Sequence, residues 1–552
     1  MSAHDSSDLS RRDFLVLGGT AAAAAALPVG ARPAGPADPP PPAARSRPVP
    51  MPDFELEEKT IAELQAGMRN GTYTARSVTQ AYLERIEATN HQGPMLRAVI
   101  ETNPDALRIA GERDAERRAG RLRGPLHGIP VIVKDNIDTH DQMQTTAGSY
   151  ALEGNFALQD AGIVARLRDA GAIILAKANL SEWANFRGNR SSSGWSGRGG
   201  QCRNPFALDR SPSGSSSGSG ASASANLCAA TVGTETDGSI VSPANACGVV
   251  GIKPTVGLLS RAGIIPIAHS QDTAGPMCRT VADAAILLGA MAGVDPRDAA
   301  TADAQGHIAA DYTTFLRNDG LRGLRIGVPR ERLLGRAPFQ DAVVEHAIAA
   351  LRDLGAEIVD PAEIATAGQL GRNERDVLMY EFKADLNAYL ATMPPAIRPR
   401  TLEDLIAFNS ANRERELPYF GQEIFEQSQE KGPLTDQAYL DARAACVDLT
   451  RAKGIDATMN EHRLDALLGA TAGPAGAIDW VYGENGLGGS SQQAAVSGYP
   501  HVTVPGGAYL GLPMNVSFYG RAWSEPVLLR IAYAFEQATH LRQVPRFLPT
   551  IP

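Results

Sequence analysis

The chain has 552 residues, of which 43% are hydrophobic and 20% charged, so its composition is that of a globular protein and excludes disorder throughout. The formal net charge is −9 and no long basic run occurs. Nucleic acid is therefore not the expected partner, because phosphate binding depends on clustered lysines and arginines. A small molecule or a peptide is the expected partner instead.

The first fifty residues have the features of an export signal followed by a tether. Arg11 and Arg12 lie in the sequence SRRDFL, and the apolar run at 14–27 is too short and too rich in glycine to span a bilayer about 30 Å thick. Residues 28–50 are rich in proline and alanine and offer little for a core. We expect twin-arginine export, a periplasmic or secreted location and one folded domain at 51–552.

Helices and short apolar strands alternate along the first half of this domain. Val78, Tyr82 and Ile86 recur at helical spacing, and Asn103 followed by proline opens a second helix. The sequence GIPVIV at 128–133 is a β-rich run that ends directly before Lys134. A helix at 161–170 and a strand at 172–176 follow.

The same alternation returns in the second half. A helix is predicted at 341–354, and strands are predicted at 324–328, 357–359, 464–468, 501–504 and 514–519. Residues 371–449 are strongly helical and charged, which indicates a helical insertion or cap. The pattern predicts an α/β fold with a large mixed, mostly parallel central sheet covered by helices on both faces.

The stretch 214–243 is unusually rich in serine and glycine and has three interpretations. It is too rich in alanine, and too closely followed by apolar residues, for a flexible linker. Its first residues, GSSSG, fit a nucleophile elbow centred on Ser216, but residues 204–213 before it contain two prolines and no β-run. A packed loop whose N–H groups converge on an oxyanion is the favoured interpretation.

Four segments together resemble the amidase signature family over almost the whole exported part. They are GIPVIVKDNI at 128–137, LAKANLSEWANFRG at 175–188, the serine-rich stretch, and CGVVGIKPTVGLLSRAG at 247–263. Within the family the chain looks closest to bacterial peptide amidases, which share GTETDGSI. Fatty-amide hydrolases and the amidotransferase component that works on charged tRNA are more distant relatives.

The resemblance implies a Ser-Ser-Lys triad. Ser239 matches the nucleophile, Ser215 the bridging serine 24 residues earlier, and Lys134 the base. Because three serines are consecutive, Ser216 and Ser217 remain alternatives for the bridging role. The family also implies a cis bond between Gly214 and Ser215.

The backbone N–H groups of Thr236, Asp237, Gly238 and Ser239 would form the oxyanion hole. Many relatives have two glycines before the nucleophile and an arginine shortly after it. This chain has Asp237 and Gly238 before Ser239, with Val241 and Ser242 after it, which changes the rim of the expected site.

The triad is chemically intelligible by itself. A serine hydroxyl becomes a good nucleophile only when a base takes its proton, and an ammonium group cannot be that base. Lys134 must therefore be neutral, and burial after an apolar run favours the uncharged form. Ser215 could pass the proton from Ser239 to Lys134 and later return it to the leaving amine. An ordinary lysine paired with Asp135 is the alternative.

Other candidate residues have plainer interpretations. We expect Lys177 and Lys253 to be structural, and Asp138 and Glu182 to cap or pair locally. No histidine has a defensible serine or aspartate partner, no HExxH occurs, and the five cysteines show no C-x-x-C pair. No metal or cofactor is expected.

The sequence thus predicts a cofactor-independent serine amidase that acts through an acyl-enzyme, with the C-terminal amide of a peptide as substrate. A fatty or aryl amide is the alternative substrate. A different class of alternative is an exported, inactive protein that binds amides or peptides. The oligomeric state is not predicted.

Overall fold

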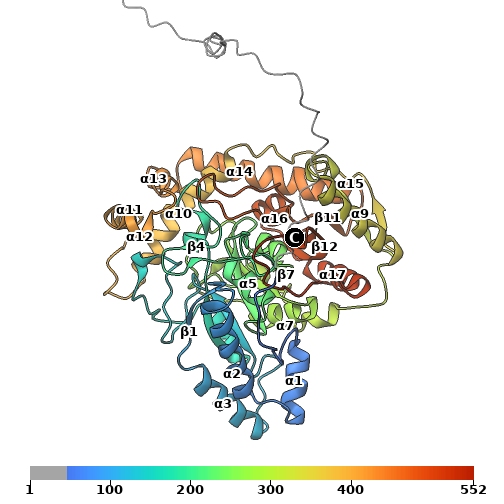
Figure 1. Ribbon diagram of the computed structural model, residues 1–552. Helices are drawn as coiled ribbons and strands as arrows, with labels where there is room; N and C mark the ends of the chain where they lie inside the picture. The colour runs from blue at the N-terminus through green and yellow to red at the C-terminus, as the bar shows by residue number, and fades with distance from the viewer. Residues whose placement is uncertain (1–46) are drawn as a thin grey trace, which may run out of the picture. The chain divides into compact units, whose positions relative to one another are not determined.

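A large central sheet organises the computed structural model, which describes residues 47–552 (Figure 1). The predicted export signal lies outside the described residues. The sheet has eleven strands in the spatial order β1-β3-β2-β6-β8-β7-β12-β13-β11-β9-β10. Their bounds are β1 Val99–Thr102, β2 Pro130–Lys134, β3 Ile173–Ala178, β6 Ala230–Glu235, β7 Val250–Lys253, β8 Thr273–Cys278, β9 Arg325–Gly327, β10 Glu357–Val359, β11 Ala466–Ala470, β12 His501–Tyr509 and β13 Leu512–Tyr519. A separate hairpin pairs β4 Trp195–Ser196 with β5 Gly200–Gln201.

The sheet is mixed, as predicted, but its parallel part is smaller than expected. Parallel pairing is confined to β3-β2-β6 on one flank and β11-β9-β10 on the other. The centre, from β6 through β8, β7, β12 and β13 to β11, is antiparallel. Helix–strand alternation identified the two flanks, because a crossover helix is what joins parallel neighbours. The centre is built from connections that this alternation does not reveal.

Two groups of helices cover the sheet. In one, α5 and α6 contact each other and the central strands; in the other, α17 contacts both α7 and α9. Helices α1 to α3 precede them in the chain, and α10 to α14 gather along one side of the molecule (Figure 1). The helix bounds are α1 Ile61–Asn70, α2 Ala75–Ile86, α3 Ala106–Arg118, α4 Gly162–Asp169, α5 Ser217–Ser224, α6 Val241–Ala246, α7 Val281–Met291, α8 Arg330–Leu333, α9 Pro338–Asp353, α10 Asn373–Ala391, α11 Leu402–Ala411, α12 Arg413–Glu416, α13 Glu423–Gln429, α14 Gln437–Thr450, α15 Asp456–Glu461, α16 Ser491–Ser497 and α17 Glu525–Thr539.

The serine-rich stretch is packed structure. Every residue of α5 is buried, and the helix lies against β6 and its neighbours. Small side chains are needed there: a Cβ added at Gly218 would lie 2.2 Å from the carbonyl oxygen of Ala98. Glycine thus allows the backbones to approach closely, and the linker interpretation is wrong.

The helical section after residue 371 has its own apolar core. Phe382, Leu386 and Leu390 of α10 are buried in a cluster with Leu402 and Phe425. Helix α10 contacts α11, α13 and α14, so it is the central helix of this section. Polar side chains on another side of α10 reach the rest of the protein and are described below.

The remaining core follows the predicted apolar pattern. In α2, Val78, Tyr82 and Ile86 are buried, and Thr74 and Ser77 form a capping box that begins the helix. All five cysteines are buried and unpaired. Among the helices of residues 47–552, none is long and apolar enough to cross a membrane.

Candidate active site

Lys134 is the last residue of β2, where the strand delivers its side chain into a fully buried polar pocket. Its Nζ lies 2.8 Å from Ser215 Oγ, 2.8 Å from Thr234 Oγ1 and 3.3 Å from the carbonyl oxygen of Thr234. Asp135 instead accepts hydrogen bonds from Thr146 and Gly148. The structure therefore brings Lys134 to Ser215 and does not pair it with Asp135.

The two predicted serines lie on adjacent segments. The backbone N–H of Ser216 donates to the carbonyl oxygen of Ser239 over 3.1 Å, and the Gly214–Ser215 bond is cis, as the resemblance implied. Ser215 and Ser239 line the same cavity. Ser216 is fully buried and its hydroxyl donates to the carbonyl oxygen of Thr234. The nucleophile elbow centred on Ser216 is thereby wrong.

A short turn at residues 236–239 connects β6 to α6 and is held from both ends. The Glu235 carboxylate accepts hydrogen bonds from the N–H groups of Ile240 at 2.7 Å and Val241 at 3.0 Å. The Thr236 hydroxyl donates to Asp272 over 2.5 Å. Gly238 adopts a φ of 78°, in the left-handed region that favours glycine.

The backbone of this turn keeps its donors available. Within the described part of the chain, the N–H groups of residues 236–239 have no backbone or side-chain acceptor. Successive unpaired N–H groups in a tight turn are suited to binding an oxyanion.

Burial tunes the charges around Lys134. It lowers the pKa of Lys134 to about 7, against the opposing influence of the carboxyl groups of Asp272 and Glu235. Burial also raises the pKa of Asp272 to about 6 and raises the pKa of Glu235. Lys134 is thus largely neutral in mildly alkaline solution and can accept a proton there.

A cavity of about 580 Å³ opens in front of the two serines. The helical section forms part of its wall through Asp385, Tyr389 and Met393 of the α10 region. The other lining residues include apolar and charged side chains: Ala157, Leu158, Ile264, Ile265, Pro266, Ile267, Pro394, Asp138, Arg261, His269, Asp272, Arg297 and Asp298. The cavity therefore suits a substrate with both polar and apolar parts.

The structure also shows the contacts of the lysines and carboxyl groups that we expected to be structural. Lys177 is fully buried and its ammonium group donates to Thr145 Oγ1 over 2.8 Å, while Lys253 donates to the carbonyl oxygen of Pro254. Glu182 forms a buried ion pair with Arg187, and Asp138 accepts a hydrogen bond from Tyr389 over 2.8 Å. Lys177, Lys253 and Glu182 thus act in local structure, whereas Asp138 pairs locally and also lines the cavity.

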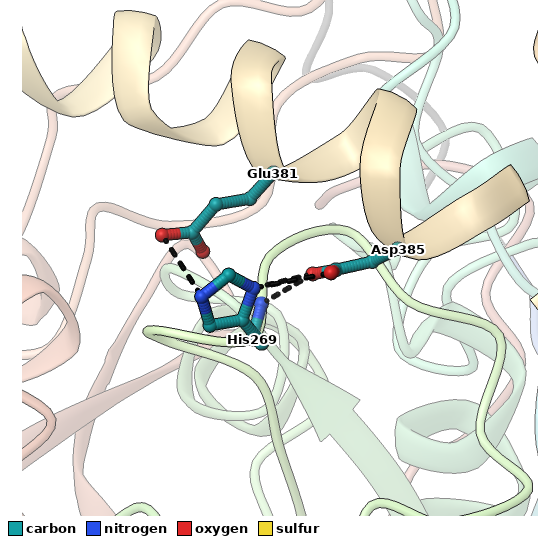
Figure 2. A group of neighbouring side chains, drawn as sticks. All are labelled: His269, Glu381 and Asp385. Carbon is teal, nitrogen blue, oxygen red and sulfur yellow. Dashed lines mark hydrogen bonds and ion pairs between the residues drawn. The ribbon is translucent and has the colours of Figure 1, made fainter. Parts of the chain in front are cut away.

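One group of side chains in residues 47–552 has ligand atoms close enough for a metal ion. His269, Glu381 and Asp385 each offer such an atom within 4.8 Å of the others. Figure 2 shows the His269 ring between the two carboxylates, with Nδ1 2.8 Å from Asp385 and Nε2 3.6 Å from Glu381. The backbone N–H groups of Ser270 and His269 also donate to these carboxylates. Hydrogen bonds and ion pairs thus account for the cluster.

Several residues that shape the site were missed by the sequence reasoning. Thr234 binds Lys134, Glu235 holds the turn, and Asp272 anchors Thr236. Thr234 and Glu235 belong to the GTETDGSI motif and lie five and four residues before Ser239. Their closeness to Ser239 in the sequence could therefore have marked them as site residues. Asp272 and Glu381 lie in segments without a recognisable motif.

The mixed sheet and the cavity beside it belong to an enzyme that hydrolyses amides, as comparison with known proteins shows. The Amidase family pattern matches residues 77–529. The chain belongs to this family and is an amidohydrolase. The alternative of an inactive binding protein is set aside.

The relatives include bacterial and plant proteins. The crystal structure of the native peptide amidase from Stenotrophomonas maltophilia is 52% identical, with a TM-score of 0.86, over 90% of this chain and 100% of that chain. A probable amidase of Arabidopsis thaliana is 42% identical over 90% of this chain and 93% of its own. A glutamyl-tRNA(Gln) amidotransferase component from Alkalilimnicola ehrlichii is 34% identical over 89% of this chain and 99% of its own.

Proposed function

We propose that the enzyme hydrolyses the C-terminal amide of peptides through the triad Ser239, Ser215 and Lys134. The observation that carries the triad is the distance of 2.8 Å between Lys134 Nζ and Ser215 Oγ beside a cavity that Ser239 also lines. Lys134 lacks a carboxylate partner in direct contact within residues 47–552, so its proton is not held by an ion pair.

The proposed reaction runs in two halves. Ser239 attacks the amide carbonyl while its proton passes to Ser215, and the Ser215 proton passes to neutral Lys134. The N–H groups of residues 236–239 stabilise the oxyanion of the tetrahedral intermediate. The same path in reverse delivers a proton to departing ammonia. Water then attacks the acyl-enzyme while its proton passes to Lys134. That proton returns to the Ser239 oxygen as the bond to the acyl group breaks, which releases the acid and restores the free enzyme.

Two observations support a peptide rather than a fatty amide. The crystallised relative named as a peptide amidase matches over its whole length, with 52% identity. The cavity wall carries polar and charged side chains, including Asp138, Arg261 and Arg297, and a long alkyl chain would displace water from them without offering a hydrogen bond in return. A peptide offers amide groups to such a wall.

We also propose that the protein is exported by the twin-arginine route and works in the periplasm or outside the cell. The support is the order of features in residues 1–50: paired arginines, an apolar run and a segment rich in proline and alanine. Export would separate the enzyme from charged tRNA, which argues against a role in tRNA amidation. Fusion of these residues to a reporter that is active only after export tests the proposal, with Arg11→Lys and Arg12→Lys as the control pair.

A substrate panel tests the proposed function. Ammonia or amine release would be measured with peptide amides, fatty amides and anilides, using the wild-type protein and Ser239→Ala. We expect the highest kcat/KM for peptide amides and a loss of at least about 10³-fold in Ser239→Ala. Equal rates for the two proteins would refute the triad, and a preference for fatty amides would refute the substrate.

A further inference from the structure

One face of α10 carries three carboxyl groups that hold the active-site segments. Glu374, Glu381 and Asp385 are spaced by seven and four residues, which places them on the same side of a helix. Glu381 and Asp385 bind the segment around His269 (Figure 2). Glu374, in the first turn of the helix, faces the 236–239 turn instead. This carboxylate face of α10 therefore joins the helical section to the candidate catalytic turn.

Glu374 meets another carboxyl group, that of Asp237, at the centre of this turn. The two side chains are within hydrogen-bonding contact of each other. Glu374 also accepts hydrogen bonds from the amide groups of Gln492 at 2.8 Å and Gln271 at 3.3 Å, and Asp237 contacts the hydroxyl of Ser491. No direct lysine or arginine partner of either carboxyl group is found within residues 47–552.

The atoms of Asp237 indicate a proton between the two groups. Its Oδ1 is buried and has no conventional donor among the described residues. Asp237 and Glu374 are each half-buried. Two carboxylates in contact with little water between them cannot both be ionised at low cost, because each charge raises the energy of the other. A single retained proton would supply the missing donor and remove one charge.

We propose that Asp237 and Glu374 share one proton and that this bond positions the 236–239 turn for catalysis. Glu374 is then a positioning residue: it acts through the backbone of Asp237, which contributes to the proposed oxyanion site. This inference rests on the proposed function and adds a residue from the helical section to it.

The bond has a predictable pH dependence. Burial and the neighbouring Asp237 carboxyl raise the pKa of Glu374 to about 8. The other titratable groups that face the pair are Lys253, whose charge favours an ionised Asp237, Glu235, and the Cys446 thiol on α14. When the shared proton leaves, two negative charges repel, the turn moves away from α10 and kcat falls.

The test is the alkaline side of the kcat–pH profile for a peptide amide. We expect wild-type kcat to fall about fivefold or more from its maximum by pH 9.5, and kcat of Glu374→Gln to stay within about twofold over that range. The glutamine amide introduced at position 374 can donate to Asp237 at every pH, so the contact is kept without a titrating proton. Asp376→Asn is the matched control: this residue of α10 pairs with Lys431 and should retain the wild-type profile.

A second measurement covers the case in which Glu374→Gln fails to fold. Infrared titration of the folded Ser239→Ala protein should show a protonated carboxyl band that disappears near pH 8 and is absent in Ser239→Ala with Asp237→Asn. An unchanged alkaline fall in folded Glu374→Gln, or a band insensitive to Asp237→Asn, would overturn the inference. Failure of the triad would appear elsewhere, as activity retained in Ser239→Ala.

Discussion

Replacing Lys134 by methionine tests the proposed general base. Methionine has a similar length and no charge, so it suits a side chain that is fully buried between strands. The hydroxyl of Ser215 then loses the acceptor that lies 2.8 Å away. General-base catalysis contributes about 10²- to 10⁴-fold, and we expect kcat to fall by that factor.

The pH dependence of activity and of stability gives a second quantitative test of the proposed base. With the pKa of Lys134 at about 7, about a tenth of the lysine is neutral at pH 6 and about nine-tenths at pH 8. Wild-type kcat/KM should therefore rise about fivefold between these values, because loss of the proposed Asp237–Glu374 proton near pH 8 offsets about half of the gain. Stability should change in the same direction. The pKa in the folded state lies below the usual 10.5, so the unfolded chain binds the extra proton and the free energy of unfolding rises from pH 7 to 10.

The assay is ammonia release from a peptide amide between pH 6 and 9, with Lys177→Met as the matched control. Lys177 is also fully buried, on neighbouring β3, but does not line the cavity. We expect this control to lose stability while keeping kcat within about fivefold. A Lys134→Met enzyme with kcat within about twofold of wild type, or a flat wild-type profile from pH 6 to 8, would refute the reasoning.

Three further predictions concern the residues that hold the site in place. Glu235→Ala removes the acceptor for the N–H groups of Ile240 and Val241. We expect kcat to fall and the free energy of unfolding to decrease by about 2 kcal/mol. An unchanged kcat would contradict the role of Glu235 in holding the 236–239 turn. Arg187→Met removes the ion-pair partner of the buried Glu182 carboxyl group. Urea denaturation should then show a free energy of unfolding lower by about 3–5 kcal/mol, and a decrease below about 1 kcal/mol would contradict this structural role. Phe382→Ala empties a buried position between Phe186 and Phe425, and calorimetry should show a lower Tm, equivalent to about 3–5 kcal/mol; an unchanged Tm would show that α10 is not held by this cluster.

The residues of the candidate site were accessible from sequence because they lie in short continuous motifs. Lys134 follows an apolar run that forms β2, and Ser215 and Ser239 belong to one serine-rich stretch. Local patterns also located α9 Pro338–Asp353 and β10 Glu357–Val359 closely, since their apolar periodicity is strong.

The contacts between distant segments could not be predicted in this way. The antiparallel centre of the sheet depends on which strands become neighbours, and β7 pairs with β12 across a separation of about 250 residues. Glu374 and Asp237 likewise meet only in the folded protein, and neither segment has a spacing that specifies the other. Long-range pairing is a property of the packed fold rather than of any single window of sequence.

Trapping the acyl-enzyme tests the central claim most directly. The wild-type protein would be mixed with a slowly hydrolysed peptide ester or anilide, quenched in acid during turnover, digested and examined by mass spectrometry. We predict that the acyl group is found on Ser239 and that it accumulates in neither Ser239→Ala nor Lys134→Met. An acyl group on another residue, or steady turnover without any labelled Ser239, would contradict the proposed mechanism.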